Sequence, residues 1–390
     1  LRSFEQQLQK IEALNLSAGF ALRFDTLSDP QFHKVFKKHT SNNISFGAFL
    51  EITPSLAQAA GVEYIGPIEH WHEAKNAYTI GYSPEERQKI IDTYMQEFTK
   101  NFGETPAFSV GWIVDTPTLS YLKTKYGVEV HQLTREQWGT DSYTLYGGPP
   151  HLPYWPSSHW ALIPSAQKNE NMPLIIRQTI TDPVWNYGDT TNSYTSQPND
   201  YALMQRGFPY FEYVFLQAHS QPNSERTFAL VGLENSMPDI DQIEFYKQLE
   251  FISHWQKNGN NRTITTPTQF AQSYTPPNIS VYEGIDKDLK TEKAWWISTP
   301  HYRVRLRQSG NEVFVSDLRI YNDAIPDPYT STSSGSIAYW NVPFIIDGSR
   351  YFENDTAQEF SLLSPDSLAS RKETPLSPER IILTTETREA

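Results

Sequence analysis

The chain contains no cysteine among its 390 residues. This absence excludes disulfides, cysteine-ligated zinc, iron–sulfur clusters and thiol catalysis. Basic residues are also outnumbered, since 32 Lys and Arg stand against 45 Asp and Glu, giving a net charge of −13. Such an acidic chain is a poor partner for nucleic acid or an anionic membrane. No apolar run approaches the roughly 18 residues of a membrane-spanning helix, so we expect no membrane insertion.

Several enzyme signatures are missing as well. The sequence has no Gly-x-Ser-x-Gly elbow, phosphate-binding loop or dinucleotide fingerprint. Serine-esterase, nucleotide and nicotinamide chemistry therefore have no support, and we expect no cofactor. The chain begins at Leu1 and shows no signal peptide, as expected for a processed or trimmed piece of a longer product. The lack of cysteine slightly favours an exported or extracellular bacterial protein.

Aromatic residues are abundant, at 14% of the chain, with 10 Trp, 22 Tyr and 21 Phe. Many gather in a long insertion over residues 138–173, and a second insertion over 183–203 is rich in Asn, Thr, Ser and Tyr. Loops of this length often cover functional sites. Aromatic faces pack well against the C–H faces of sugars, but the same rings could close one end of the fold as a satellite core.

A repeating pattern organises the first 280 residues: a short apolar run ends at a polar or acidic residue, and a helix follows. The predicted strands cover 18–24, 45–50, 108–114, 128–133, 174–180, 228–233 and 262–265. The clearest helix begins after Ser83, which forms a capping box with Glu86, and ends at Gly103. Continuously apolar strands that alternate with helices indicate a parallel sheet covered on both faces, and seven of them favour a (β/α)7-type barrel.

The pattern changes after about residue 280. Residues 302–307 alternate, Ser309-Gly310-Asn311 makes a turn, and 313–321 returns as the second strand of a hairpin. Further runs at 336–346 and 381–385 indicate an antiparallel β-sandwich. We therefore predict an α/β fold with two domains, a barrel over 1–280 and a β-rich sandwich over 281–390.

Carboxylates follow five of the predicted barrel strands, at Asp25, Glu51, Asp115, Asp182 and Glu234. Catalytic groups of such barrels lie at the carboxyl ends of the strands. Glycoside hydrolysis needs two carboxyls, one protonated to serve as general acid and one ionised as nucleophile or base. Other roles stay open: Asp115 as the N-cap of the next helix, Glu234 held by a loop amide, and Asp25 and Glu51 in rim salt bridges.

The triplet His70-Trp71-His72 is a weak metal-binding candidate. Its two imidazoles lie on the same side of an extended segment, flanked by Glu69 and Glu73. The spacing implies no third ligand, and pairs of this kind are common by chance, so we predict no metal site. Elsewhere, His131, His151 and His159 could bind substrate hydroxyls or serve in the core.

Together these segments resemble the barrel shared by polysaccharide deacetylases and glycoside hydrolase family 57-type enzymes, over roughly residues 4–275. The run from Phe46-Gly47 to Leu56 resembles the strand that carries the deacetylase metal histidines. The matching positions are Phe49 and Thr53, and only Pro54 is kept. The strand that carries the deacetylase aspartate pair would precede Leu1, so we expect the first barrel strand to be missing.

The sequence more closely resembles a bacterial branch that lacks the deacetylase metal histidines. The shared motifs are Gly103-x-x-Pro106, Val110-Gly111-Trp112, Asp115, Lys125-Tyr126-Gly127, Thr140-Asp141-x-Tyr143, Gly147-Gly148 and Gly232-Leu233-Glu234-Asn235-Ser236. The resemblance implies a carbohydrate-active hydrolase whose fourth and seventh strands carry the reacting carboxylates. Asp115 and Glu234 end those strands here.

We therefore predict a retaining glycosidase with Asp115 as nucleophile or stabilising carboxylate and Glu234 as general acid/base. Its carboxyls would lie about 5–5.5 Å apart, against about 6.5–9.5 Å for an inverting enzyme. The predicted substrate-binding residues are Asp25, Glu51, Trp112, Trp138, Asp141, Tyr143, Trp155 and Asp182.

Two alternatives remain. One is a non-catalytic carbohydrate-binding or cell-surface protein on a degenerate barrel. The other is a metal-dependent deacetylase whose site is rebuilt from Asp25, His70 and His72.

Overall fold

The first predicted strands form one parallel sheet in the computed structural model, which describes residues 1–39, 41–185, 195–221, 227–234, 236–286, 292–347 and 360–361. This sheet has five strands in the order β1-β2-β3-β4-β6, and each neighbouring pair is parallel. The strands are β1 (Ala18–Leu22), β2 (Ile44–Phe49), β3 (Phe108–Val110), β4 (Val130–Leu133) and β6 (Leu174–Arg177). Because all five run the same way, their carboxyl ends share one edge, as predicted.

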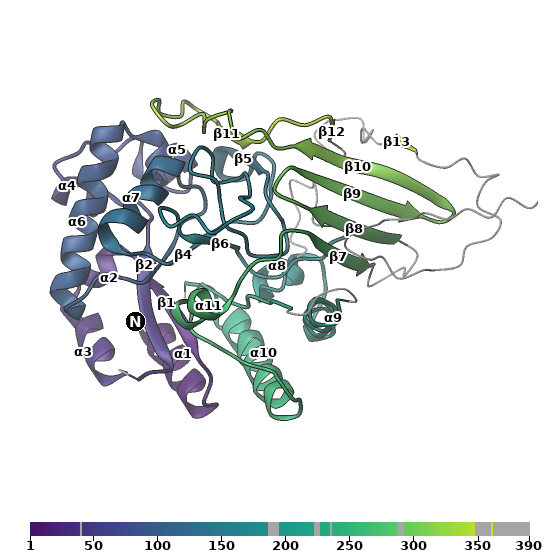
Figure 1. Ribbon diagram of the computed structural model, residues 1–390. Coiled ribbons are helices and arrows are strands. Elements are labelled where there is room, and N and C mark those ends of the chain that lie inside the picture. The colour runs from purple at the N-terminus through teal and green to yellow at the C-terminus, as the bar shows by residue number, and fades with distance from the viewer. Residues whose placement is uncertain are drawn as a thin grey trace, which may run out of the picture.

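Helices connect these strands and surround the sheet (Figure 1). They are α1 (Arg2–Ala13), α2 (Phe24–Ser28), α3 (Pro30–Lys38), α4 (Pro54–Ala59), α5 (Ala74–Ala77), α6 (Pro84–Phe102), α7 (Thr116–Tyr126), α8 (Pro198–Leu203), α9 (Phe208–His219), α10 (Asp239–Lys257) and α11 (Pro267–Ser273). Short 3-10 turns lie at Ile68–His70, Thr79–Gly81 and Thr140–Ser142. The capping box of α6 is confirmed, and Gly103 ends that helix with φ 79°. None of the described helices is long and apolar enough to cross a membrane.

Alternating side chains give the parallel sheet two packed faces. Ile175 joins the larger core, which includes residues of α1, α6, α7 and α10. Its neighbours Leu174 and Ile176 point the opposite way and pack with Phe108 and Val130. Helix α11 covers this second face, where the ring centroids of Phe228 and Phe270 lie 4.9 Å apart. A parallel sheet buried on both faces explains why its strands are apolar almost throughout.

The closed seven-stranded barrel is not confirmed. The predicted strands at 228–233 and 262–265 have no regular strand structure, although both segments are described. The first of them still lies beside the extension of β6, because the Ile180 amide donates to the Leu230 carbonyl at 2.9 Å. The apolar pattern of residues 228–233 correctly predicted an extended segment. It did not show that this segment lacks the continuous backbone hydrogen bonds of a regular strand.

A separate antiparallel sheet follows, in the order β12-β10-β9-β8-β7, with β13 also pairing with β10. Its strands are β7 (Ser280–Ile285), β8 (Glu292–Ser298), β9 (Tyr302–Ser309), β10 (Glu312–Ile320), β12 (Ile346–Asp347) and β13 (Phe360–Ser361). The predicted hairpin is β9-β10, and Gly310 at its turn has φ 57°. The described residues supply one sheet of the predicted sandwich, and the run 381–385 lies outside them.

The two halves of the chain are interleaved. Strand β11 (Ala338–Asn341), expected in the antiparallel region, pairs in parallel with β5 (Tyr143–Tyr146) of the aromatic insertion. The segment before β11 also reaches the first half, since Arg87 of α6 donates to the carbonyls of Tyr329 and Thr332. A division of the chain at residue 280 therefore separates strands that share one small sheet.

A buried network of charges joins the antiparallel sheet to the aromatic insertion. Arg303 of β9 and Arg319 of β10 are fully buried, and both donate to Asp317 at 2.8–2.9 Å. Arg319 also pairs with Asp347 at 2.7 Å. Arg303 crosses to the insertion, where it pairs with buried Glu136 and donates to the Gly148 carbonyl. Each guanidinium has carboxylate partners that offset the cost of removing its charge from water.

This network predicts that Arg303→Met lowers the free energy of unfolding by about 3–5 kcal/mol, because Glu136 and part of Asp317 would remain buried without a cation. Arg307→Met on the same strand is the matched control. Its ion pair with Glu292 is partly exposed, so its loss should cost less than about 1 kcal/mol. Urea unfolding of both variants measures the difference, and equal losses would contradict the prediction.

Candidate functional site

The carboxyl ends of β1 and β2 carry a charged cluster around Arg23. Its guanidinium contacts Asp25 and Glu51, each at 2.9 Å. Asp25 also accepts hydrogen bonds from the hydroxyls of Thr53, at 3.0 Å, and Ser55. Arg23 and Asp25 remain partly open to solvent, whereas Glu51 is buried. Of the two roles expected for Asp25 and Glu51, substrate binding and rim salt bridges, the salt bridges are present.

Glu51 is held between two opposing influences. Burial raises the pKa of its carboxyl above the ordinary value, the negative charge of Asp25 adds to this rise, and the positive charge of Arg23 offsets only part of it. The Arg23 contact therefore favours the ionised form of a carboxylate that burial alone would favour as the neutral acid. The site is anchored on strand ends, which hold side chains more rigidly than loops do.

Asp141 lies at the tip of the hairpin formed by residues 137–145. Backbone hydrogen bonds between Gln137 and Leu145 close this hairpin at 3.0 and 3.2 Å. Asp141 has φ 52°, in the left-handed region that Asp tolerates better than most residues. Burial raises the pKa of its carboxyl, and the charges of His72 and Arg135 act in the opposite direction.

Glu234 lies at the end of the extended segment 228–234. Its backbone carbonyl faces the Gln242 amide of α10 at 3.4 Å, and its side chain is exposed to solvent. Even so, desolvation by the surrounding protein raises the pKa of Glu234, and the charges of Glu51, Asp200 and Asp141 raise it further.

The charges of Glu51 and Asp141 both act on Glu234, and we call these three residues the carboxylate cluster. Buried Tyr78 lies among them: burial raises its pKa first, and the charges of all three carboxylates add to the effect. Tyr143 is similarly buried and affected by Asp141. The structure thus brings together five predicted residues, which are Asp25, Glu51, Asp141, Tyr143 and Glu234.

Asp115, the predicted nucleophile, is fully buried and acts as the N-cap of α7. Its oxygens accept hydrogen bonds from the Thr118 amide at 2.9 Å and the Thr79 hydroxyl at 2.6 Å. The guanidinium of Arg87 lies 3.2 Å away. These contacts correspond to the capping role considered as the alternative, and they leave no carboxylate oxygen open to a substrate.

Asp182 is also fully buried, so it does not have the exposed position that the predicted substrate-binding role requires. Its Oδ1 accepts from the Val184 amide at 2.8 Å, beside the contact between Trp296 Nε1 and the Pro183 carbonyl. Burial raises the pKa of Asp182 to about 6, and the main charges acting on it belong to Asp286 and Arg206. It therefore lies against the antiparallel sheet instead of joining the carboxylate cluster.

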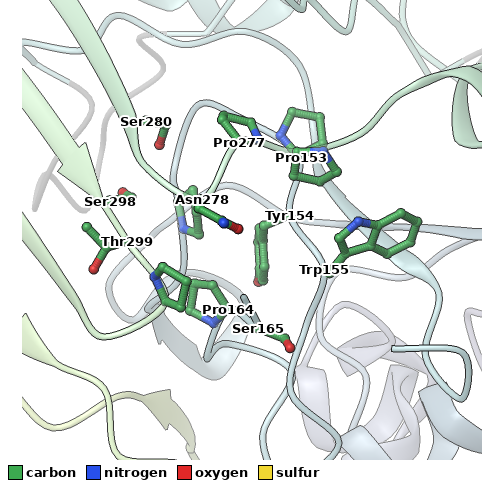
Figure 2. Close-up of a pocket in the computed structure, with 13 residues that line it drawn as sticks. Pro153, Tyr154, Trp155, Pro164, Ser165, Pro277, Asn278, Ser280, Ser298 and Thr299 are labelled. Carbon is green, nitrogen blue, oxygen red and sulfur yellow. The ribbon is translucent and has the colours of Figure 1, made fainter. Parts of the chain in front are cut away.

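The predicted tryptophans occupy three different places. Trp112 follows β3 and contacts Phe49 at a centroid distance of 5.3 Å. Trp138 precedes Asp141 in the hairpin and lies 6.1 Å from Tyr339 of β11. Trp155 lines the pocket of Figure 2, between the aromatic insertion and the first residues of the antiparallel sheet. Tyr154 and several Pro, Ser, Thr and Asn residues complete that lining, and it includes no carboxylate, so this pocket does not suit acid–base chemistry.

No metal centre is recognisable in the part of the chain that the structure describes. His70 pairs with Glu73 at 2.7 Å, and its ring stacks with that of His72 at 6.2 Å. Within the described ranges, no group of three or more His, Asp or Glu side chains has the geometry to hold a metal. Asp25 is engaged by Arg23, and the positions matching the deacetylase histidines are Phe49 and Thr53. The donor set therefore does not fit a deacetylase metal.

Sequence reasoning missed several members of the site. Arg23 had a usable signal, because residues two apart on an extended segment point to the same side and Asp25 had already been selected. Tyr78, Arg135 and Asp200 belong to no motif. Arg135 lies 3.4 Å from Asp200, and this ion pair joins α8 to the segment just before the aromatic insertion.

Comparison with known proteins gives a fold-level likeness. No model of a known protein family matches the sequence, and no curated protein matches it. Among solved structures, it is similar to one from Parabacteroides distasonis described as a "putative glycoside hydrolase/deacetylase". The TM-score is 0.58 at 12% sequence identity, over 89% of this chain and 85% of the other. This likeness supports a distant relationship in fold between the two proteins.

The capping role of Asp115 predicts a large effect on stability. Asp115→Ala removes one partner of a buried ion pair with Arg87, so we expect the free energy of unfolding to fall by about 3–5 kcal/mol. Asp29→Ala is the matched control, because Asp29 caps α3 at an exposed position. That change should cost about 0.5–2 kcal/mol. Chemical denaturation of both variants tests the difference, and a smaller loss for Asp115→Ala would contradict it.

Buried histidines predict a loss of stability in acid. Desolvation lowers the pKa of His131 to about 3, with its Nδ1 2.7 Å from the Ser109 hydroxyl. In the unfolded chain a histidine titrates near its ordinary pKa of about 6.5, so between these values the unfolded state binds the extra proton. The free energy of unfolding should therefore fall as pH decreases from about 6.5 towards 3.

His131→Gln should reduce the slope of the unfolding free energy against pH in this range by the contribution of one proton. Val130→Ala, a core substitution on the same strand, should lower stability by a similar amount at both ends of the window. Urea unfolding at pH 7 and pH 4.5 measures both. An unchanged pH slope in His131→Gln would show that His131 is not kept neutral in the folded protein.

Proposed function

We propose that the protein is a carbohydrate-active hydrolase, and more specifically a glycosidase that uses Glu234 and Glu51. The observation that carries this proposal is the carboxylate cluster beside the carboxyl end of β2, where the pKa of Glu234 is raised and Glu51 is paired with Arg23. The likeness to the Parabacteroides distasonis structure, whose description names glycoside hydrolase activity, supports the same class.

In this proposal Glu234 is the general acid. Desolvation and the neighbouring carboxylates raise its pKa, so it keeps its proton to higher pH than an ordinary glutamic acid. It donates that proton to the glycosidic oxygen as the bond between this oxygen and the anomeric carbon breaks. The leaving sugar departs with a neutral hydroxyl, and Glu234 is left as a carboxylate. Water then supplies the hydroxyl that takes the vacated position on the anomeric carbon, and the proton that this water releases returns the two carboxyls to their starting state.

Glu51 replaces Asp115 as the proposed second carboxyl. Arg23 fixes one of its oxygens at 2.9 Å and favours the ionised state that a nucleophile, a base or an electrostatic stabiliser needs. Its negative charge would stabilise the positive charge that develops on the anomeric carbon. Asp141 keeps the substrate-binding role predicted from the sequence, because its side chain is only half-buried. Tyr143 is 1% exposed, so in this proposal it supports the hairpin from the core instead of binding substrate.

This proposal predicts that Glu234→Gln and Glu51→Gln each reduce hydrolysis of a glycan panel by about 10²–10⁴-fold, while glycan binding is retained. Glu170→Gln is the control, because Glu170 is a highly exposed residue in the insertion. Reducing-sugar release measures hydrolysis, and calorimetry measures binding. If the parent binds glycans but hydrolyses none of them, the proposal fails in favour of a carbohydrate-binding protein.

The raised pKa of Glu234 also predicts the shape of the pH profile. Activity should decline as pH rises through that pKa, because the acid must be protonated to act. Arg23→Gln removes the charge that favours ionised Glu51, so the acidic limb of the profile should move to higher pH. An acidic limb that does not move would exclude Glu51 as the group that must be ionised.

A further inference from the structure

An aromatic rim borders the carboxylate cluster, and it extends beyond the residues of the proposed reaction. It consists of Trp71, His72, Trp138 and Tyr339, contributed by three segments that are distant in the sequence. Trp71 is 53% exposed and Tyr339 is 50% exposed. Single exposed rings are common on protein surfaces, whereas exposed rings gathered at one edge of a site mark a surface suited to ligand binding.

Contacts between the three segments place these rings around one edge of the site. The rings of Trp71 and His72 meet edge to face at 5.9 Å, and the charge of His72 acts on Asp141. Helix α5, which follows His72, contacts the turn Thr140–Ser142. Trp138 precedes that turn in the sequence, and its ring centroid lies 6.1 Å from that of Tyr339. Figure 1 shows α5, β5 and β11 on the same side of the molecule.

The backbone beneath the rim is firmly held. The Tyr339 amide donates to the Tyr329 hydroxyl at 2.8 Å, and Tyr339 pairs with Thr144 of β5. The Ser334 amide reaches the Ile80 carbonyl at 2.6 Å. The exposed rings therefore extend from a fixed base, so a ligand could pack on them without first ordering the chain.

The charge and polarity of this region define what could cover it. The adjoining site contains Asp25, Glu51, Asp141 and Glu234, and the chain carries a net charge of −13. An anionic polymer would be repelled from such a surface. A neutral glycan chain meets both conditions, because its hydroxyls suit carboxylates while the C–H faces of its rings suit aromatic side chains.

We propose that the aromatic rim binds further sugar units of a neutral glycan chain whose reacting unit lies at the carboxylate cluster. This inference rests on the proposed function and deepens it, since it makes the substrate an oligosaccharide or polysaccharide instead of a single glycoside. Tyr339 comes from the C-terminal part of the chain, so the rim would be incomplete without the pairing of β11 with β5.

The test measures affinity against glycan length in the Glu234→Gln background, where binding is separated from hydrolysis. The probes are neutral oligosaccharides of two and six units from β-glucan, xylan, mannan and chitin, with polygalacturonate as the anionic polymer. We expect six units to bind about tenfold more tightly than two in at least one series, which corresponds to about 1.4 kcal/mol. Polygalacturonate should not bind.

Trp71→Ala and Tyr339→Ala should each bring the ratio of the two affinities close to one. Tyr302→Ala, an exposed aromatic of the antiparallel sheet, should leave the ratio unchanged. Circular dichroism of all three variants would verify the fold. Loss of length dependence in Tyr302→Ala as well would point to a general effect and overturn the assignment.

The outcomes separate this inference from the proposed function. Length-dependent binding that the rim variants lose, in a protein whose parent hydrolyses nothing, would support the rim and refute the glycosidase. Hydrolysis by the parent with equal affinity for two and six units would refute the rim alone. An absence of binding by every neutral series, or preferential binding of polygalacturonate, would also overturn the rim proposal.

Discussion

The pairing of buried Arg303 with Asp317 and Glu136 is the interaction on which the arrangement of the two sheets depends. Without this pairing, the inner face of the antiparallel sheet would bury the charge of Arg303 with no carboxylate to offset the cost. With it, the sheet is fixed to the aromatic insertion through oppositely charged groups at hydrogen-bond distance. Buried ion pairs of this kind often add little net stability, yet they are intolerant of misalignment, so they select one docking geometry over others. Here that geometry determines where the insertion can lie.

The same interaction reaches the proposed site through the backbone. Glu136, the partner of Arg303, also accepts a hydrogen bond from the Gly147 amide at 2.9 Å. Residues 136 and 147 flank the hairpin whose tip carries Asp141, and Arg177 at the end of β6 adds a hydrogen bond to the Gly147 carbonyl. The hairpin is therefore fixed at its base by charges from the antiparallel sheet and by the parallel sheet. Its tip can then hold Asp141, whose backbone lies in the left-handed region, beside Glu51 and Glu234.

Local signals in the sequence predicted what local interactions determine. The capping box of Ser83 and Glu86, the glycine at 103 and the apolar strand runs were sufficient for α6 and the five parallel strands. Residues 302–307 predicted a strand but not the burial of its arginines, because alternating arginines in a strand usually face water, and the burial of Arg303 also depends on Glu136, more than a hundred residues away. The carboxylates showed the same limit: an aspartate before Thr-Pro has the same pattern as N-cap or nucleophile, and Thr79 and Arg87 distinguish the two only in three dimensions.

The parallel pairing of β11 with β5 joins residues 338–341 to residues 143–146, about 195 positions earlier. During synthesis the aromatic insertion would leave the ribosome with an unsatisfied strand edge and would wait for most of the remaining chain before that edge could be paired. Contacts of such long sequence separation slow folding and prolong exposure of partly formed surfaces. We therefore expect folding to be completed late, after residues 338–341 have been synthesised. Until then the unpaired edge of the insertion would need protection.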